Sequence, residues 1–296
     1  RLITFNDTCS GAHCATIVEA EGRRRVRSVA TPLYDITPDG SLGLSLDFAR
    51  LARMRPGYGY VDLPDRTAGE LAPADNGIWR VDMTRGERQL LFSLASIAAH
   101  DPSEDMAEAE HYFNHISIAP NGEEFLFFHL WVEAPGQAQR WKSRLFTARM
   151  DGSQLKLLAD DANPSHYCWM PDGSLLVTMV KRDGSGTEYR LFAGSEVSAP
   201  YKAWLPVRDG HPSVSPDGRL LLNDSYPDRF GEQTLDVYEL ATGRHIDLGH
   251  YGVAPYLKGE IRGDLHPRWS ADGRWVYFDS THRGKRAIYG VTLDAD

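Results

Sequence analysis

One short phrase recurs five times along this chain of 296 residues, and each copy ends in a tight turn. The phrase closes with Pro-Asp-Gly or a close relative, and Asp-Gly or Asn-Gly between apolar runs is a strong signal for a β-hairpin. The turn glycines are Gly40, Gly122, Gly173, Gly218 and Gly273. They are separated by 82, 51, 45 and 55 residues, and the last three intervals are close to the period of a repeat fold.

The sequence around each turn has the same order of elements. In the copy that ends at Gly122, strands are predicted at residues 124–129, 144–149 and 154–158, with a second turn at Asp151-Gly152. A β-sandwich is the alternative all-β fold, but a sandwich does not repeat one turn phrase at this period. Four antiparallel strands in each repeated unit describe a propeller blade. We therefore predict an all-β fold, a β-propeller of four-stranded antiparallel blades.

Six blades are visible in the sequence, and we expect seven in the complete propeller. Residues 1–30 have the pattern of the later strands of a blade, so we expect the N-terminal part of the first blade to be missing from the chain. Residues 50–76 are expected to form an inserted loop, and the acidic residues 101–110 a linker or a short helix. The whole chain, residues 1–296, is predicted to form a single propeller domain.

Composition excludes some classes of partner. The net charge of −9 argues against a general nucleic-acid surface, which would need a basic face. No apolar run approaches the roughly 18 to 20 residues that a membrane span needs. The three cysteines have no metal-finger spacing; Cys9 and Cys14 are close enough to form a bridge, which the sequence leaves open, and Cys168 is expected to be buried. The cellular compartment stays undecided.

Four of the five copies carry a histidine seven residues before the turn glycine, at His115, His166, His211 and His266, where the fifth copy has Leu33. Equivalent positions of propeller blades lie around one axis, so we expect the four imidazoles to approach one another near one mouth of the channel. A single histidine there commonly caps a loop, and duplication of a repeat can copy it. Four in register favour a functional site, because imidazole is both a metal ligand and a base near neutral pH.

Other polar and aromatic residues stand near these histidines in the sequence. Asp264 precedes His266 by two residues and would add an oxygen ligand for a divalent cation; Asp209 precedes His211 by the same spacing. The planar guanidinium of arginine suits a carboxylate, and aromatic faces suit sugar rings. Candidates of these two kinds are Arg144, Arg262, Arg268, Tyr167 and Trp141.

The phrases at residues 211–218 and 266–278 resemble the repeats of TolB-like propellers. A narrower resemblance, carried by residues 142–153, residues 165–169 and the histidines His211 and His266, is to the oligogalacturonate lyase type of polysaccharide lyase, a seven-bladed propeller. Related propeller lyases act on other uronate-containing polysaccharides, including those with rhamnose linked to glucuronate.

The lyase resemblance implies a role for several residues. His211 and His266 would be ligands of a manganese ion, His166 the catalytic histidine and Arg144 the catalytic arginine. The family has a second histidine two positions after the one that matches His266, where this chain has Arg268, and its glutamine ligand has no clear counterpart. Asp264 would replace that ligand, so the cation is expected to be divalent, with manganese and calcium both open.

We therefore expect an enzyme, a polysaccharide lyase that cleaves a uronate-containing oligosaccharide by β-elimination. His166, Arg144 and His115 are the expected catalytic residues, His115 as a substrate contact or a fourth ligand. The expected metal ligands are His211, His266 and Asp264, and the expected substrate contacts are Arg268, Arg262, Tyr167 and Trp141. The expected partner is an acidic oligosaccharide, not nucleic acid.

Two other functions stay open at this point. One is a non-catalytic TolB-like propeller that binds a protein or a glycan. The other is a glycoside hydrolase, which would need paired carboxylates about 5 to 10 Å apart, such as Asp209 and Asp264. The uronate and its linkage, endo or exo action and the oligomeric state are not predicted from the sequence.

Overall fold

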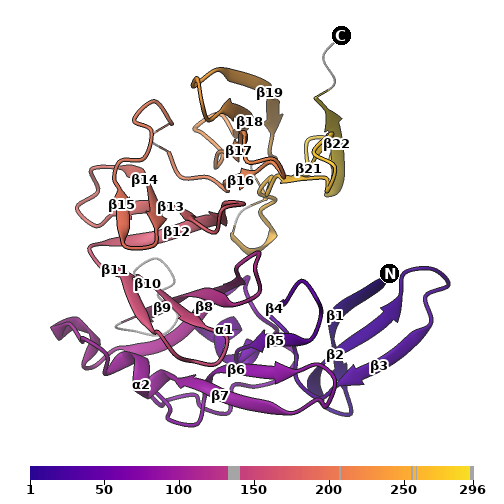
Figure 1. Cartoon of the computed structure of the whole chain (residues 1–296), viewed down its shortest axis with the longest axis vertical. Helices are drawn as coiled ribbons and strands as arrows, with labels where there is room; N and C mark the ends of the chain where they lie inside the picture. Colours follow the sequence, from indigo (N-terminus) through magenta and orange to yellow (C-terminus); the bar gives the residue numbers. More distant parts are fainter. Residues whose placement is uncertain (133–140, 207, 255, 258, 294–296) are drawn as a thin grey trace. The chain divides into compact units, whose positions relative to one another are not determined.

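The computed structural model describes residues 1–132, 141–206, 208–254, 256–257 and 259–293, apart from the side chain of residue 260. The strands in these residues form six antiparallel sheets (Figure 1). The chain separates into two compact units, residues 1–160 and residues 161–296, which are described in turn. None of the helices in the described residues is long and apolar enough to cross a membrane.

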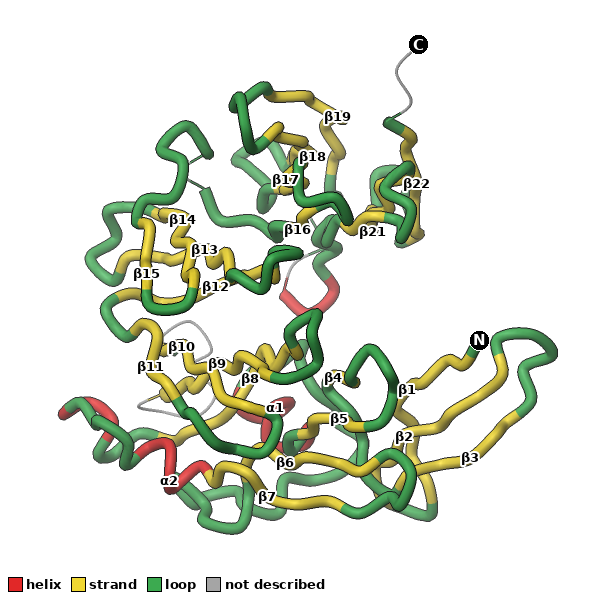
Figure 2. Tube along the Cα trace, in the orientation of Figure 1, coloured by secondary structure: helices red, strands yellow, loops and turns green. Residues whose placement is uncertain are grey.

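The first unit contains three sheets and both α-helices found in the described residues (Figure 2). The first sheet has strands β1 (Leu2–Cys9), β2 (Ala12–Glu19) and β3 (Arg25–Val29). The second has β4 (Asp35–Ile36), β5 (Leu42–Ser45), β6 (Gly77–Asp82) and β7 (Arg88–Ser93). The third has β8 (Glu110–Ile118), β9 (Glu124–Val132), β10 (Lys142–Arg149) and β11 (Lys156–Ala159). The helices are α1 (Phe48–Met54), α2 (Leu94–Ala98) and a 3-10 turn (Glu104–Met106).

The second unit contains the other three sheets. Its first sheet has β12 (Ala162–Trp169), β13 (Leu175–Lys181), β14 (Thr187–Ala193) and β15 (Glu196–Ser198). The next has β16 (Ser213–Val214), β17 (Leu220–Asp224), β18 (Glu232–Glu239) and β19 (His245–Gly252). The last has β20 (Arg268–Trp269), β21 (Trp275–Ser280) and β22 (Ala287–Thr292), preceded by a 3-10 turn (Gly259–Ile261). In each sheet the strands are neighbours in sequence order, as in a propeller blade.

The recurring phrase forms the hairpin turn between the first two strands of a blade. In the copy that ends at Gly218, the backbone N–H of Gly218 donates to the carbonyl of Ser215 over 2.8 Å, and the hydroxyl of Ser215 donates to Asp217 over 2.6 Å. Gly218 has φ +74°, in the left-handed region that favours glycine. The Pro-Asp-Gly sequence therefore forms a tight hairpin turn, as predicted.

Consecutive turns of the same unit touch one another. A side-chain carbon placed on Gly273 would meet Pro216 at 3.5 Å, and one placed on Gly218 would meet Pro171 at 3.4 Å. The proline of one copy thus packs against the glycine of the next.

The predicted all-β propeller of four-stranded antiparallel blades is confirmed, and so is the number of six visible blades. The first and last sheets have three strands each, and the described residues contain no seventh sheet. The loop expected at residues 50–76 includes most of α1 and no strand, and the acidic stretch holds the 3-10 turn at Glu104–Met106. Cys9 and Cys14 form a disulfide. The single domain over residues 1–296 stays a prediction.

An apolar cluster between the last two blades holds the loop that precedes β20. It is made of Leu222, Leu235, Val237, Leu265, Val276 and Phe278. Leu265 has no exposed surface, and its carbonyl accepts a hydrogen bond from the backbone of Asp279 over 2.8 Å. Because Leu265 is anchored in this way, the next residue, His266, has a defined position at the edge of the core.

A first prediction concerns Gly210, the residue before His211. A side-chain carbon at Gly210 would lie 2.1 Å from the carbonyl oxygen of Asp224, so Gly210→Ala forces the backbone to shift. We expect a loss of about 1 to 3 kcal/mol in the free energy of unfolding, measured by urea denaturation. The control is Gly252→Ala, where the added carbon meets nothing within 4 Å and the change should stay within about 0.5 kcal/mol. Equal losses in both variants would contradict the close packing at Gly210.

Candidate functional site

Three of the four histidines in register lie together in the second unit. His166 is on β12, and His211 and His266 are in the loops that precede β16 and β20. The ring centroids of His166 and His211 are 4.0 Å apart, and those of His211 and His266 are also 4.0 Å apart. The three imidazoles therefore form a row with His211 in the middle, from three consecutive blades.

The buried carboxylate of Asp224 contacts two members of this row, His211 and His266. Asp224 ends β17 and has no exposed surface. It accepts from the backbone N–H of His211 over 2.6 Å, from the ring Nδ1 of His211 over 2.9 Å and from the backbone N–H of His266 over 3.2 Å. Burial acts to lower the pKa of His211, but the attraction to Asp224 outweighs it and the net pKa is raised.

Sequence reasoning missed Asp224. The signal was present, because Asp224 follows the apolar run of residues 220–222 by two positions. A carboxylate at the end of a buried strand needs partners, and here the partners are the two loops that carry His211 and His266.

His166 and Asp209 form a second histidine–carboxylate pair. Nδ1 of His166 lies 2.9 Å from Asp209, whose other oxygen accepts from the hydroxyl of Ser165 over 2.8 Å. We assign the Nδ1 proton from this contact, which leaves Nε2 as an acceptor, 3.3 Å from the hydroxyl of Tyr226. Burial and the nearby His211 lower the pKa of His166 more than Asp209 raises it. His166 is thus a neutral imidazole at neutral pH, the form that a base needs.

His211, Asp264 and His266 can hold a cation. One ligand atom from each lies within 4.8 Å of the others. The bond from Nδ1 of His211 to Asp224 is the usual outer contact of a metal-binding histidine, since it fixes the tautomer and leaves Nε2 for the metal. The set of two nitrogens and one oxygen suits a divalent transition metal.

The arginines near this cluster have different partners. Arg262 forms a two-bonded ion pair with Asp264, over 2.6 and 2.8 Å, and so competes with a cation for that carboxylate. Arg268, which stands where a histidine was expected from the family pattern, bonds to Asp279 and to the carbonyl of His266, both over 3.1 Å. Arg268 therefore supports the loop of His266 and adds no ligand.

Two of the histidines have unusual backbones. His266 has φ +41° and His115 has φ +51°, a region that non-glycine residues rarely adopt. Such conformations cost about 1 to 3 kcal/mol and concentrate at functional sites. The strain at His266 is stabilised by the hydrogen bond from its backbone to the buried Asp224.

His115 belongs to the first unit. Its ring makes edge contacts with Phe128 at 5.0 Å and with Tyr58 at 6.1 Å. The guanidinium of Arg55 lies 4.6 Å from the ring of Tyr58 and 4.5 Å from the ring of Trp141. Two of the expected residues, His115 and Trp141, are thus linked through an aromatic and cationic cluster.

Arg144, the expected catalytic arginine, has no exposed surface in the first unit. Its guanidinium donates to Nδ1 of His129 over 3.1 Å and to the carbonyls of Asp101 and Ile97 over 2.8 and 2.7 Å. His129 and two backbone carbonyls thus enclose the guanidinium, and its role as the catalytic arginine stays a prediction. The pattern of charged residues in the sequence could not distinguish it from an arginine at the surface.

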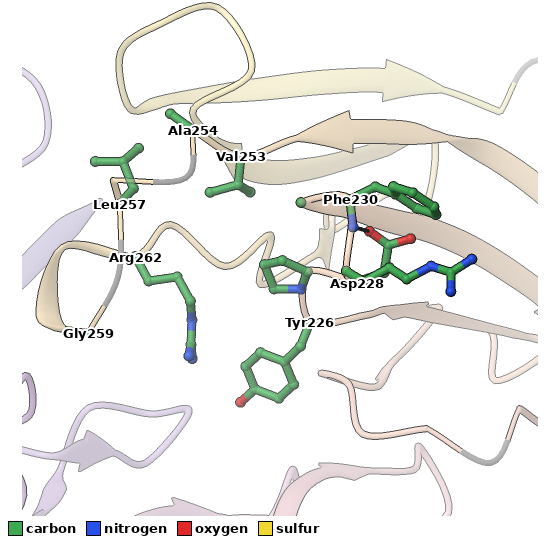
Figure 3. Close-up of a pocket in the computed structure, with 11 residues that line it drawn as sticks. Tyr226, Asp228, Phe230, Val253, Ala254, Leu257, Gly259 and Arg262 are labelled. Atoms are coloured by element: carbon green, nitrogen blue, oxygen red, sulfur yellow. Dashed lines mark hydrogen bonds between the residues drawn. The ribbon is translucent and has the colours of Figure 1, made fainter.

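Two pockets border the site in the second unit. The first, of about 480 Å³, is lined among others by Tyr226, Asp228, Phe230 and Arg262, with the guanidinium of Arg262 4.7 Å from the ring of Tyr226 (Figure 3). The second, of about 490 Å³, includes Asp209 and shares Tyr226 with the first. Both are in the size range of small-ligand sites. Tyr167, half-buried on β12, lines neither.

No protein-family model matches the chain, and no curated protein sequence matches it. The fold is similar to solved structures. TolB from Acinetobacter baumannii has a TM-score of 0.53 at 16% identity, covering 99% of this chain and 61% of TolB. The β-propeller domain of the Trilobed protease from Pyrococcus furiosus has 0.57 at 11%, covering 99% and 78%. An oligogalacturonate lyase in complex with manganese has 0.48 at 13%, covering 99% and 86%. Identities this low show a shared propeller fold and leave the activity open.

A second prediction follows from the partners of Arg144. Burial and the charge of Arg144 lower the pKa of both His129 and His111, whose rings are bonded over 2.9 Å. Above about pH 6.5 both are neutral in the folded and the unfolded chain. Below it the unfolded chain binds protons that the fold excludes, so stability falls by up to about 1.4 kcal/mol per pH unit for each histidine.

The measurement compares the free energy of unfolding between pH 7 and pH 5. His129→Gln should reduce the slope, while His100→Gln, at an exposed histidine of the same unit, should leave it unchanged. An unaltered slope in His129→Gln would mean that these buried histidines do not determine the acid sensitivity.

Proposed function

We propose that this protein is a polysaccharide lyase that cleaves a uronate-containing oligosaccharide by β-elimination. The observation that carries the proposal is the neutral His166, oriented by Asp209, beside His211 and a cluster able to hold a cation. A base and a source of positive charge at one place are the two requirements of this chemistry. The resemblance of the sequence to propeller lyases points the same way.

In the proposed reaction His166 acts as the base. Nε2 takes the proton from C5 of the uronate, next to the carboxylate, while Asp209 stabilises the imidazolium that forms. The electron pair of the C5–H bond forms the C4=C5 double bond, and the bond from C4 to the glycosidic oxygen breaks. The departing oxygen takes a proton from water. General-base assistance of this kind contributes on the order of 100- to 10,000-fold in rate.

The negative charge that develops on the uronate carboxylate must be stabilised. Arg262, which lines the first pocket and is ion-paired with Asp264, is one arginine of the second unit that could approach it, in place of the enclosed Arg144. His211, Asp264 and His266 are the residues that would hold a divalent cation. When bound, such a cation would supply positive charge next to the carboxylate.

The alternative is a non-catalytic propeller that binds a protein or a glycan, as the TolB-like repeats allow. Such a propeller needs the turns but has no need of a neutral, oriented histidine. A glycoside hydrolase is less consistent with the site, since Asp209 and Asp264 are each bonded to a basic side chain, His166 and Arg262.

A third prediction tests the base. We expect His166→Gln to lower kcat on a cleaved uronate oligosaccharide by about 100-fold or more, because Gln keeps a polar side chain but cannot take the proton. The measurement is the ultraviolet absorbance of the unsaturated product. The control is His282→Gln, a histidine of the same unit bonded to Ser280. An unchanged kcat in His166→Gln would exclude this histidine as the base.

A fourth prediction tests the cation site by binding alone. Titration calorimetry with MnCl₂ should show one site, and His266→Ala should weaken it by about 10-fold or more, because a ligand nitrogen is lost. His282→Ala, in the same blade and outside the cluster, should bind as the unaltered protein does. Equal affinity in all three proteins would show that His266 is not a ligand.

A further inference from the structure

One carboxylate of the cation cluster, that of Asp264, is already paired with an arginine. Nε and Nη2 of Arg262 donate to its two oxygens over 2.6 and 2.8 Å, so both oxygens have a partner. The pair is partly open to water, since the side chain of Arg262 is 38% exposed and that of Asp264 is 11% exposed. Ion pairs that water reaches are weak, and Asp264 is therefore able to exchange this partner for another.

Arg262 and His266 flank Asp264 in one loop, each two residues away. Leu265, next to Asp264, is buried and anchors this loop. A ring nitrogen of His266 and one of His211 lie within 4.8 Å of a carboxylate oxygen of Asp264. A divalent cation bound to these three atoms needs an oxygen to which Arg262 now donates.

The surroundings of Asp264 call for a positive partner. The carboxylates of Asp224, Asp264 and Asp209 each act to raise the pKa of His211, so all three are close to this ring. Arg262 supplies one positive charge to Asp264. A divalent cation on the same carboxylate supplies two, and at such short range it repels the guanidinium. The arginine and the cation are therefore alternative partners of Asp264.

Arg262 also lines the first pocket, of about 480 Å³ (Figure 3). Its guanidinium lies 4.7 Å from the ring of Tyr226, whose hydroxyl is 3.3 Å from Nε2 of His166. An arginine that leaves Asp264 thus stays within side-chain reach of this pocket. There it offers Nε and Nη2, the two donors that it has withdrawn from Asp264, to the carboxylate of a ligand.

We propose that Arg262 is an exchangeable partner of Asp264. It neutralises Asp264 until a divalent cation binds to His211, Asp264 and His266; the ion pair then opens, and the guanidinium turns to a carboxylate in the first pocket. Cation and carboxylate bind cooperatively, because each of them favours the open pair and linkage is reciprocal. This inference rests on the proposed function, from which it takes the cation site and the uronate ligand.

Titration with MnCl₂, followed by the electron paramagnetic resonance signal of free Mn²⁺, tests the exchange. Arg262→Gln removes the competitor, so we expect Mn²⁺ to bind about 3- to 10-fold more tightly than to the unaltered protein. Arg262→Lys keeps the charge but loses the two-bonded geometry, and should bind Mn²⁺ about 2-fold or more tightly. The control is Arg229→Gln, which removes the same charge from the same pocket at an arginine that contacts Phe230, and should leave the affinity unchanged.

Three results would overturn the exchange. Equal Mn²⁺ affinity in Arg262→Gln and the unaltered protein would do so and leave the lyase function standing. A gain in Arg262→Gln that Arg229→Gln shares, or that Arg262→Lys lacks, would reveal an effect of charge at a distance. Absence of Mn²⁺ binding in every protein would remove the cation site, whereas the lyase function is decided separately by the cleavage assay with His166→Gln.

The coupling is tested with glucuronate, which carries the carboxylate but has no glycosidic bond to cleave. Saturating glucuronate should tighten Mn²⁺ binding to the unaltered protein about 3-fold or more, after correction for the Mn²⁺ that glucuronate itself binds. The gain should disappear in Arg262→Gln, and the neutral methyl glucoside should produce none. Mn²⁺ affinity that glucuronate does not change, or changes equally in Arg262→Gln, would overturn the coupling.

Discussion

The buried carboxylate of Asp224 is the interaction on which the site depends. It accepts hydrogen bonds from the backbones of two loops and from the ring of His211, and thereby joins two consecutive blades at their inner edge. A carboxylate without exposed surface is costly unless it has such partners. The loops of His211 and His266 provide them, and for this reason both histidines are held close together even though His266 has a strained backbone.

Two histidine–carboxylate pairs lie side by side in this unit but differ in their electrostatics. Asp224 binds His211 through both the ring and the backbone and raises its pKa, whereas burial prevails at His166 and lowers its pKa. The same pair of residue types thus occurs with a lowered histidine pKa in one place and a raised histidine pKa in the next. Separation of roles by environment is typical of acid–base sites.

The fold could be predicted from the turns, because a Pro-Asp-Gly hairpin is decided by local backbone geometry and the packing of one turn's proline on the next glycine repeats it. The grouping of His166, His211 and His266 followed from their equal distance to the turns. The burial of Arg144 could not be predicted, because it depends on the carbonyls of Asp101 and Ile97, more than 40 positions away in the chain.

The sequence by itself determined the blade pattern and the register of the histidines, which follow from periodicity, since equal spacing leads to equal position in a repeat fold. The resemblance to propeller lyases implied His211 and His266 as candidate ligands, and Asp264 was added because it stands two residues before His266. Only the tertiary structure decided which carboxylate each histidine contacts, that Arg262 rather than Arg144 borders a pocket, and that Tyr226 lines two pockets. Those features arise from residues of different strands and loops brought together by packing, and no local pattern encodes them.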